Sequence, residues 1–139
     1  MTPDGTELQG IRILVDDDEE DTRLFVQTLL EDEGAEVRLA TGGEEGLALA
    51  RAESFDIMTL DLSMPGMNGV ELFAELRKAP GLEDLPICIV TGHAELRGTL
   101  YERSAKVPDG FLNKPVDPAT LVSTLRRILD LRERRSARD

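Results

Sequence analysis

The chain has 139 residues, of which 40% are hydrophobic and 32% are charged, a size and composition typical of one folded globular domain. Its formal net charge of -12 argues against general nucleic-acid binding, which gains affinity from cationic contacts to phosphates. No apolar run is long enough to cross a bilayer and no signal peptide precedes the first one, so we expect no membrane contact. The single cysteine, Cys88, excludes a disulfide within the chain and favours a cytoplasmic location.

Five short apolar runs alternate with segments of helical periodicity along the chain. Residues 1–10 are polar and punctuated by glycine and proline, so we expect a flexible leader there. The apolar runs predict buried strands at 11–15, 36–40, 56–60, 86–90 and 110–113. The segments between and after them predict helices at 19–33, at 43–52, from Asn68-Gly69 to Pro80, within 94–104, and from Asp117 onwards.

Several helix ends carry recognisable signals. Gly34 is typical of a helix C-cap, and Asp117 followed by Pro118 is typical of a helix N-cap and first turn. Gly46 lies inside the second predicted helix, where it costs about 1 kcal/mol relative to alanine. The arginines that follow residue 125 are interpreted as a solvated helix end with a charged C-terminal tail over 132–139, in preference to a docking tail or linker stub.

The alternation of strands and helices predicts an α/β fold, a parallel sheet with helices on both faces. Ligands bind at the carboxyl ends of such strands, where Asp16, Asp17 and Asp18 follow the first strand and Asp61 follows the third. At about 4 Å two like charges repel by roughly 4 kcal/mol at an effective dielectric of 20. The cluster therefore calls for a raised pKa or a bound cation, and its oxygen donors predict Mg2+ as the cofactor.

Strands four and five bring a hydroxyl and an ammonium to the same edge, from Thr91 and from Lys114. A carboxylate can attack phosphorus and form an acyl phosphate. That reaction needs a divalent cation and fixed donors for the phosphoryl oxygens. Metal-binding acids, the isolated Asp61, a threonine and a lysine are the minimal set for it.

The chain resembles the receiver domain of two-component response regulators over nearly its whole length, from about Ile11 to Leu131. Four ordered motifs carry the resemblance: Ile13-Leu14-Val15-Asp16-Asp17-Asp18-Glu19, Asp61-Leu62-Ser63-Met64-Pro65-Gly66-Met67-Asn68-Gly69, Thr91-Gly92-His93-Ala94 and Phe111-Leu112-Asn113-Lys114-Pro115. The resemblance implies a flavodoxin-like fold with five parallel strands in the order 2-1-3-4-5 and a receiver domain over 11–131.

The resemblance also implies roles for the acidic residues. Asp61 would be the phosphoacceptor. Asp18 would bind Mg2+ directly, Asp17 would act largely through water, and the carbonyl of Ser63 would supply another metal oxygen. Asp16 stands at a position that is usually apolar in the family, and we expect it to be an edge acid whose side chain points away from the site.

The resemblance implies that the peptide bond between Lys114 and Pro115 is cis. It also implies that the Lys114 ammonium pairs with Asp61 or with the phosphoryl group. Thr91 would donate its hydroxyl to that group. Its movement would open a space into which Phe111, at the switch-aromatic position, rotates, and this would reshape the helix four–strand five–helix five face. His93 is expected at an exposed edge, where it tunes the access of water.

The implied partners are a histidine kinase or a histidine phosphotransfer protein, and a downstream protein target on the helix four–strand five–helix five face. The chain could also form a homodimer. We expect self-catalysed phosphotransfer and autodephosphorylation rather than turnover of a separate substrate.

Three other functions compete with this interpretation. A haloacid-dehalogenase-type phosphatase would use Asp16 and Asp18 as an Asp-x-Asp pair, but the sequence shows no second acidic metal motif on a late strand and no room for a cap domain. A degenerate receiver acting as a constitutive interaction module would not need the complete set of site residues. A nucleotide-binding domain is disfavoured because the first strand–helix loop is acidic rather than glycine-rich.

Overall fold

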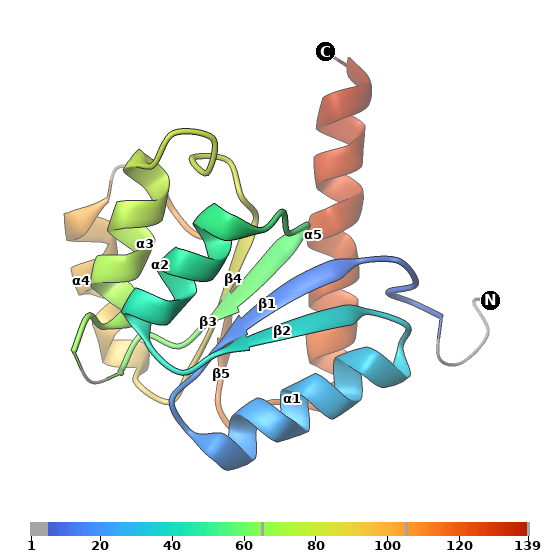
Figure 1. Ribbon diagram of the computed structural model, residues 1–139, viewed down its shortest axis with the longest axis horizontal. Helices are drawn as coiled ribbons and strands as arrows, with labels where there is room; N and C mark the ends of the chain where they lie inside the picture. Colours follow the sequence, from blue (N-terminus) through green and yellow to red (C-terminus); the bar gives the residue numbers. More distant parts are fainter. Residues whose placement is uncertain (1–5, 65, 105, 139) are drawn as a thin grey trace.

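The computed structural model describes residues 6–64, 66–104 and 106–138 (Figure 1). Five parallel strands form one sheet in the order β2-β1-β3-β4-β5, which confirms the expected fold class and strand order. The strands are β1 (Arg12–Asp16), β2 (Glu36–Ala40), β3 (Ile57–Leu60), β4 (Ile87–Thr91) and β5 (Gly110–Asn113). The helices are α1 (Glu20–Asp32), α2 (Gly43–Ala52), α3 (Gly69–Lys78), α4 (Arg97–Arg103) and α5 (Pro118–Arg138), with a 3-10 turn at Ala94–Leu96 before α4.

Helices cover both faces of the sheet, with α1 and α5 on one face and α2, α3 and α4 on the other (Figure 1). Side chains alternate between these layers along each strand, because successive residues of a strand point to opposite faces. The α1/α5 layer buries Ile13, Val15, Val26, Leu30 and Leu121. The opposite layer buries Leu14, Met58, Leu60, Leu72 and Phe73. Both faces are thus closed, and the open edge lies at the strand ends.

Capping residues set the helix boundaries as the sequence predicted. Gly34 adopts a positive φ of 92° directly after α1, a conformation that costs glycine little. The Asn68 side chain accepts a hydrogen bond from the Glu71 N–H at 3.0 Å and so begins α3. The Asp117 carboxylate accepts one from the Thr120 N–H at 2.9 Å at the start of α5. These caps fix where each connecting loop enters the sheet edge.

The N-terminal segment differs from the flexible leader expected over 1–10. From residue 6 onwards it is part of the domain, while residues 1–5 lie outside the described part. Leu8 is fully buried in the α1/α5 layer, and its N–H donates to the Glu33 carbonyl at 2.9 Å. The Arg126 guanidinium donates to the Glu7 carbonyl at 3.1 Å. One apolar residue between polar neighbours is enough to hold the segment, because α1 and α5 leave a space that Leu8 fills.

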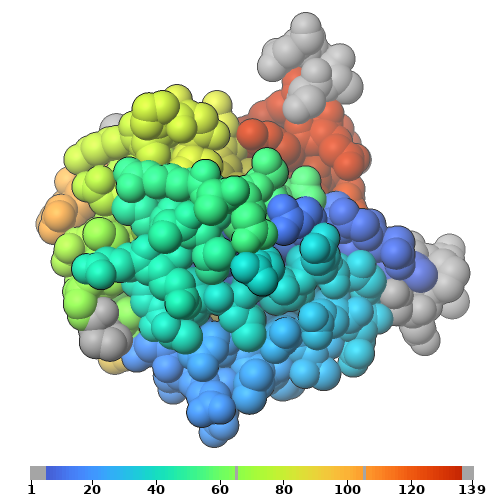
Figure 2. All heavy atoms as spheres, viewed as in Figure 1, coloured from blue at the N-terminus to red at the C-terminus, as the bar shows by residue number. Residues whose placement is uncertain are grey.

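The charged C-terminal segment expected over 132–139 continues helix α5 as far as Arg138. This end of α5 extends beyond the sheet (Figure 1), and in the space-filling view its described part lies against the body of the domain (Figure 2). The Arg132 guanidinium there donates to the Asp84 carbonyl. Across the described residues, none of the helices combines the length and the apolar character that crossing a membrane requires.

Candidate functional site

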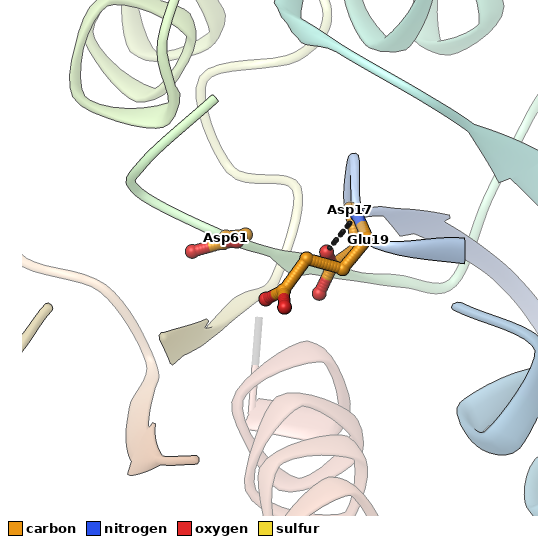
Figure 3. A group of neighbouring side chains, drawn as sticks. All are labelled: Asp17, Glu19 and Asp61. Atoms are coloured by element: carbon orange, nitrogen blue, oxygen red, sulfur yellow. Dashed lines mark hydrogen bonds between the residues drawn. The ribbon is translucent and has the colours of Figure 1, made fainter. Parts of the chain in front are cut away.

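The site lies at the carboxyl edge of the sheet, where the ends of β1, β3 and β5 meet. Asp17 follows β1, Asp61 follows β3 and Lys114 follows β5. Asp17 and Asp61 are 4% and 3% exposed, so both carboxylates are largely removed from water. Figure 3 shows Asp17 and Asp61 converging with a third acid, Glu19, from the loop between β1 and α1. The sheet topology therefore brings residues far apart in sequence into one small volume.

The ammonium of Lys114 lies among these three acids and offsets part of their negative charge. Its Nζ atom lies 2.8 Å from Asp17 Oδ2, 3.1 Å from Asp61 Oδ2 and 2.7 Å from Glu19 Oε1. The Lys114–Pro115 peptide bond is cis, as the resemblance implied. An ammonium has three N–H donors, so each carboxylate accounts for one of them. Three negative charges thus surround one positive charge, and the cluster keeps a net negative charge.

Asp17 and Asp61 each also accept a backbone hydrogen bond from the residue two positions further on. The Glu19 N–H donates to Asp17 Oδ1 at 2.9 Å, and the Ser63 N–H donates to Asp61 Oδ1 at 3.2 Å. Aspartate commonly makes such local bonds at turns. One oxygen of each carboxylate is therefore fixed by its own loop and the other by Lys114, which orients both side chains.

The loop after Asp61 approaches so closely that one position requires glycine. A Cβ atom at Gly69 would overlap the Asp61 carbonyl, and the Gly69 N–H donates to the Leu62 carbonyl at 3.0 Å. The first residue of α3 is therefore held against the backbone of the acceptor loop. This contact explains the Asn68-Gly69 pair that begins the third predicted helix.

The charges in the cluster shift one another's protonation. Burial raises the pKa of Asp17, and the hydrogen bond from Lys114 opposes that effect. Burial by itself would lower the pKa of Lys114, but hydrogen bonds to Asp17 and Glu19 outweigh it and hold that pKa above its ordinary value. The same lysine lowers the pKa of Glu19 through its hydrogen bond. Lys114 is consequently a fixed cation at neutral pH.

The donor set fits a hard divalent cation. Carboxylate oxygens of Asp17, Glu19 and Asp61 lie within 4.8 Å of one another (Figure 3). Carboxylate oxygens are the kind of donor that Mg2+ and similar hard cations prefer. Asp18, expected to be the direct ligand, is exposed and is not one of the three. Glu19 was missed by the sequence interpretation. Its position directly after the acidic pair, one residue before α1, is the signal that could have identified it.

Thr91 is the last residue of β4 and His93 lies just after it. Strand β4 pairs with β5, the strand that Lys114 follows. Thr91 is fully buried, and its carbonyl accepts a hydrogen bond from the Lys114 N–H at 2.9 Å. Its Oγ1 accepts one from the His93 N–H at 3.1 Å. His93 is exposed, as expected, and its Nδ1 lies 3.1 Å from Glu95 Oε1. The β4 and β5 ends are thus joined at the site through Thr91 and Lys114.

Asp16 is not the exposed edge acid that the sequence suggested. It is 1% exposed, and neither of its carboxylate oxygens has a hydrogen-bond partner among the described residues. Burial raises its pKa to about 8, with the charges of Glu45 and Asp17 adding to the effect. Its side chain lies against α2, where a Cβ atom at Gly46 would overlap Oδ2. The expectation that it points away from the site is in keeping with this contact with α2.

An arginine covers Phe111, the residue that the resemblance implied to be a switch aromatic. Phe111 is half-buried against the α2/α3/α4 layer, and the Arg97 guanidinium carbon lies 4.7 Å from its ring centroid. The Arg97 Nε also donates to the Tyr101 hydroxyl at 2.7 Å. A cation over an aromatic face is attracted to it, by about 0.5–1 kcal/mol at an exposed site. The outer face of the Phe111 ring is therefore shielded from water by Arg97.

The strand order and the acidic pocket at the carboxyl edge place this domain in the flavodoxin-like class of α/β proteins. The family model described as the response regulator receiver domain matches residues 13–126. The chain therefore belongs to that family and is a receiver domain of two-component signalling.

Individual relatives are similar over most of their length. Protein PilH from Pseudomonas aeruginosa is 34% identical over 118 residues, which are 85% of this chain and 97% of that protein. The crystal structure of a CheY-like response regulator receiver domain protein from Methanospirillum hungatei has a TM-score of 0.80 and 31% identity, covering 90% of this chain and 98% of that one. The structure of the chemotaxis protein CheY4 from Vibrio cholerae has a TM-score of 0.77 and 32% identity, covering 85% and 98%.

Proposed function

We propose that Asp61 accepts a phosphoryl group from the phosphohistidine of a histidine kinase or a histidine phosphotransfer protein, with Mg2+ as the cofactor. The observation that carries this proposal is the setting of Asp61. Its carboxylate is held between Lys114 Nζ at 3.1 Å and the Ser63 N–H at 3.2 Å, next to the Asp17 carboxylate. A fixed carboxylate beside a cation and further acids is what acyl phosphate formation requires.

In the reaction, a carboxylate oxygen of Asp61 forms a bond to phosphorus while the phosphorus–nitrogen bond of phosphohistidine breaks. The leaving imidazole takes up a proton. Lys114 neutralises charge on the phosphoryl oxygens, since its ammonium already lies on Asp61. The Thr91 Oγ1 accepts a hydrogen bond from the His93 N–H. The hydroxyl proton of Thr91 therefore stays available for donation to a phosphoryl oxygen.

We further propose that Asp17, Asp18, Asp61 and the Ser63 carbonyl hold the Mg2+ ion. When bound, the ion would neutralise the negative charge that the phosphoryl group adds to an already acidic pocket. Asp18 lies in the exposed loop after Asp17, so it can turn toward an arriving cation without losing buried contacts. The haloacid-dehalogenase alternative is not favoured, because Asp16 faces α2 rather than the cluster around Lys114.

The phosphodonor is proposed to dock beside α1. Leu24 and Phe25 are each 46% exposed on this helix. A shallow cavity of about 290 Å3 joins α1 to the loop after β5 and is lined by Asp21, Thr22, Phe25, Lys114, Pro115 and Val116. Exposed apolar side chains next to the acceptor suit a transient protein contact. A phosphohistidine presented there would face the end of Lys114.

Phosphorylation is proposed to act on the α4–β5–α5 face and so on a downstream protein target. The phosphoryl group adds about -1.5 to -2 charge. Movement of Thr91 toward it would allow Phe111 to turn inward, which breaks the contact between the Phe111 ring and Arg97. A cytoplasmic location and the formation of a homodimer belong to the same proposal.

The proposal is tested by incubating the full chain with acetyl phosphate and Mg2+ and weighing it by intact mass spectrometry. The wild-type chain is expected to gain one phosphoryl group, and the gain is expected to vanish without Mg2+. An Asp61→Asn variant keeps the shape of the side chain but removes the nucleophile. Equal labelling of this variant and the wild type would refute the assignment of Asp61.

A further inference from the structure

The ion pair between Glu19 and Lys114 has a consequence for phosphoryl acceptance at Asp61. The three N–H donors of the Lys114 ammonium face three carboxylates, those of Asp17, Glu19 and Asp61. An incoming phosphoryl oxygen can gain a hydrogen bond from Lys114 only if one of these carboxylates gives up its donor. In the resting state, all three N–H donors of Lys114 are thus already in use.

The three carboxylates differ in whether water can replace Lys114 as their hydrogen-bond partner. The side chains of Asp17 and Asp61 are 6% and 3% exposed, so without a bound cation a freed oxygen there would lack water to replace the lysine. The Glu19 side chain is 61% exposed, so its carboxylate can turn into solvent. Glu19 is therefore the partner that exchanges most readily. Its carboxylate also adds a third negative charge within 4.8 Å of oxygens of both buried acids.

We propose that Glu19 is a positioning residue that restrains phosphoryl acceptance: in the resting state it holds one Lys114 donor, and it must release that donor before Lys114 can bind a phosphoryl oxygen. This inference rests on the proposed function of Asp61 and adds a residue that acts through Lys114. It makes the rate of phosphorylation depend on the strength of an ion pair in which the Glu19 side chain is 61% exposed and the Lys114 side chain is 12% exposed. Water hydrates the Glu19 carboxylate on release, so the net cost of release stays near that of exposed ion pairs, about 0.2–1 kcal/mol.

The test compares two isosteric variants of the full chain, Glu19→Gln and Glu20→Gln. Both remove one acid, but Glu20 belongs to the exposed first turn of α1 and is not one of the acids around Lys114. With acetyl phosphate and saturating Mg2+, the Glu19→Gln chain is expected to become phosphorylated about two- to fivefold faster than the wild type. The Glu20→Gln chain is expected to keep the wild-type rate.

A second readout follows Lys114 without any phosphorylation. The NMR signals of the Lys114 side-chain methylene and ammonium groups are expected to shift in Glu19→Gln and to stay in place in Glu20→Gln, without Mg2+. A Glu19→Gln rate equal to or below the wild-type rate would overturn the inference, and a rate below it would indicate that Glu19 assists the metal instead. An equal gain in Glu20→Gln, or an unchanged Lys114 signal in Glu19→Gln, would also overturn it.

The experiments distinguish a failure of the proposed function from a failure of the role of Glu19. If the wild-type chain takes up no phosphoryl group, the proposed function fails and this inference fails with it. If the wild-type chain is phosphorylated on Asp61 at the same rate as the Glu19→Gln chain, only the role of Glu19 is lost.

Discussion

The carboxylate of Asp16 occupies the space that a side chain at position 46 would need. A Cβ atom built on Gly46 would overlap Asp16 Oδ2. The glycine in the middle of α2 is therefore explained by a buried acid on β1. The close packing of α2 on β1 therefore depends on both Asp16 and Gly46.

Replacing Gly46 by alanine tests this relationship. In an unconstrained helix the change stabilises by about 1 kcal/mol, but here the added methyl group meets Asp16, and we expect a loss of about 1–3 kcal/mol. Urea unfolding of the variant measures the change. Gly98→Ala in α4 is the matched control, because a Cβ atom there would meet nothing within 4 Å. The double variant Asp16→Ala/Gly46→Ala should recover stability relative to Gly46→Ala, and strict additivity of the two changes would contradict the contact.

Asp16 also predicts a dependence of stability on pH. Its pKa in the folded chain is about 8, whereas an unfolded chain has about 3.9. Between these values the folded state holds a proton that the unfolded state has released, so the free energy of unfolding falls as pH rises. The fall is at most about 1.4 kcal/mol per pH unit. Unfolding curves of the wild type and Asp16→Asn, without divalent cations, measure it. The variant should show a flatter profile, and identical slopes from about pH 5 to about pH 8 would refute the buried proton.

Asp18 is expected to matter for the metal and not for the fold. Because its side chain is exposed, Asp18→Asn should leave the free energy of unfolding unchanged to within about 0.5 kcal/mol in the absence of Mg2+. Because we propose it as a direct ligand, the variant should bind Mg2+ about tenfold more weakly in calorimetry. The exposed neighbouring acid at Asp21, replaced by asparagine, is the control. A wild-type Mg2+ affinity in Asp18→Asn would assign the cation to Asp17, Glu19 and Asp61 alone.

Phe111 is expected to connect the acceptor to the output face without taking part in the chemistry. The Phe111→Ala chain should become phosphorylated at the wild-type rate, because the Phe111 ring packs against Arg97 and the α2/α3/α4 layer and carries no group that acts in the phosphotransfer. Phosphorylation should shift the backbone amide signals of α4 in the wild type, and this shift should be much smaller in the variant. Equal shifts of the α4 amides in both chains would show that the signal bypasses the aromatic ring.

Much of this structure could be predicted from sequence because its signals are local. Apolar runs identify the strands, and capping residues such as Gly34 and Asp117 identify the helix ends. The parallel topology then places Asp61 and Lys114 at one edge, whatever the distance between them in sequence. These features can be predicted because the local sequence patterns agree with the fold.

Other features depend on contacts that no local pattern reports. Leu8 is a single apolar residue in a polar segment, and only the space between α1 and α5 determines its burial. Strand alternation suggested the direction of Asp16 but not its burial, which depends on Gly46 in another element. Glu19 reaches the site through the length and freedom of its side chain, and Arg97 covers Phe111 across two elements.

The central claim is that Asp61, and no other acid of the cluster, carries the phosphoryl group. Reduction of an acyl phosphate by borohydride converts the aspartyl residue into homoserine, which marks the position permanently for peptide mapping. After incubation with acetyl phosphate and Mg2+, we expect homoserine at position 61 in the wild-type chain and at no position in Asp61→Asn. Homoserine at position 16, 17 or 18, or at no position in the wild-type chain, would contradict the account.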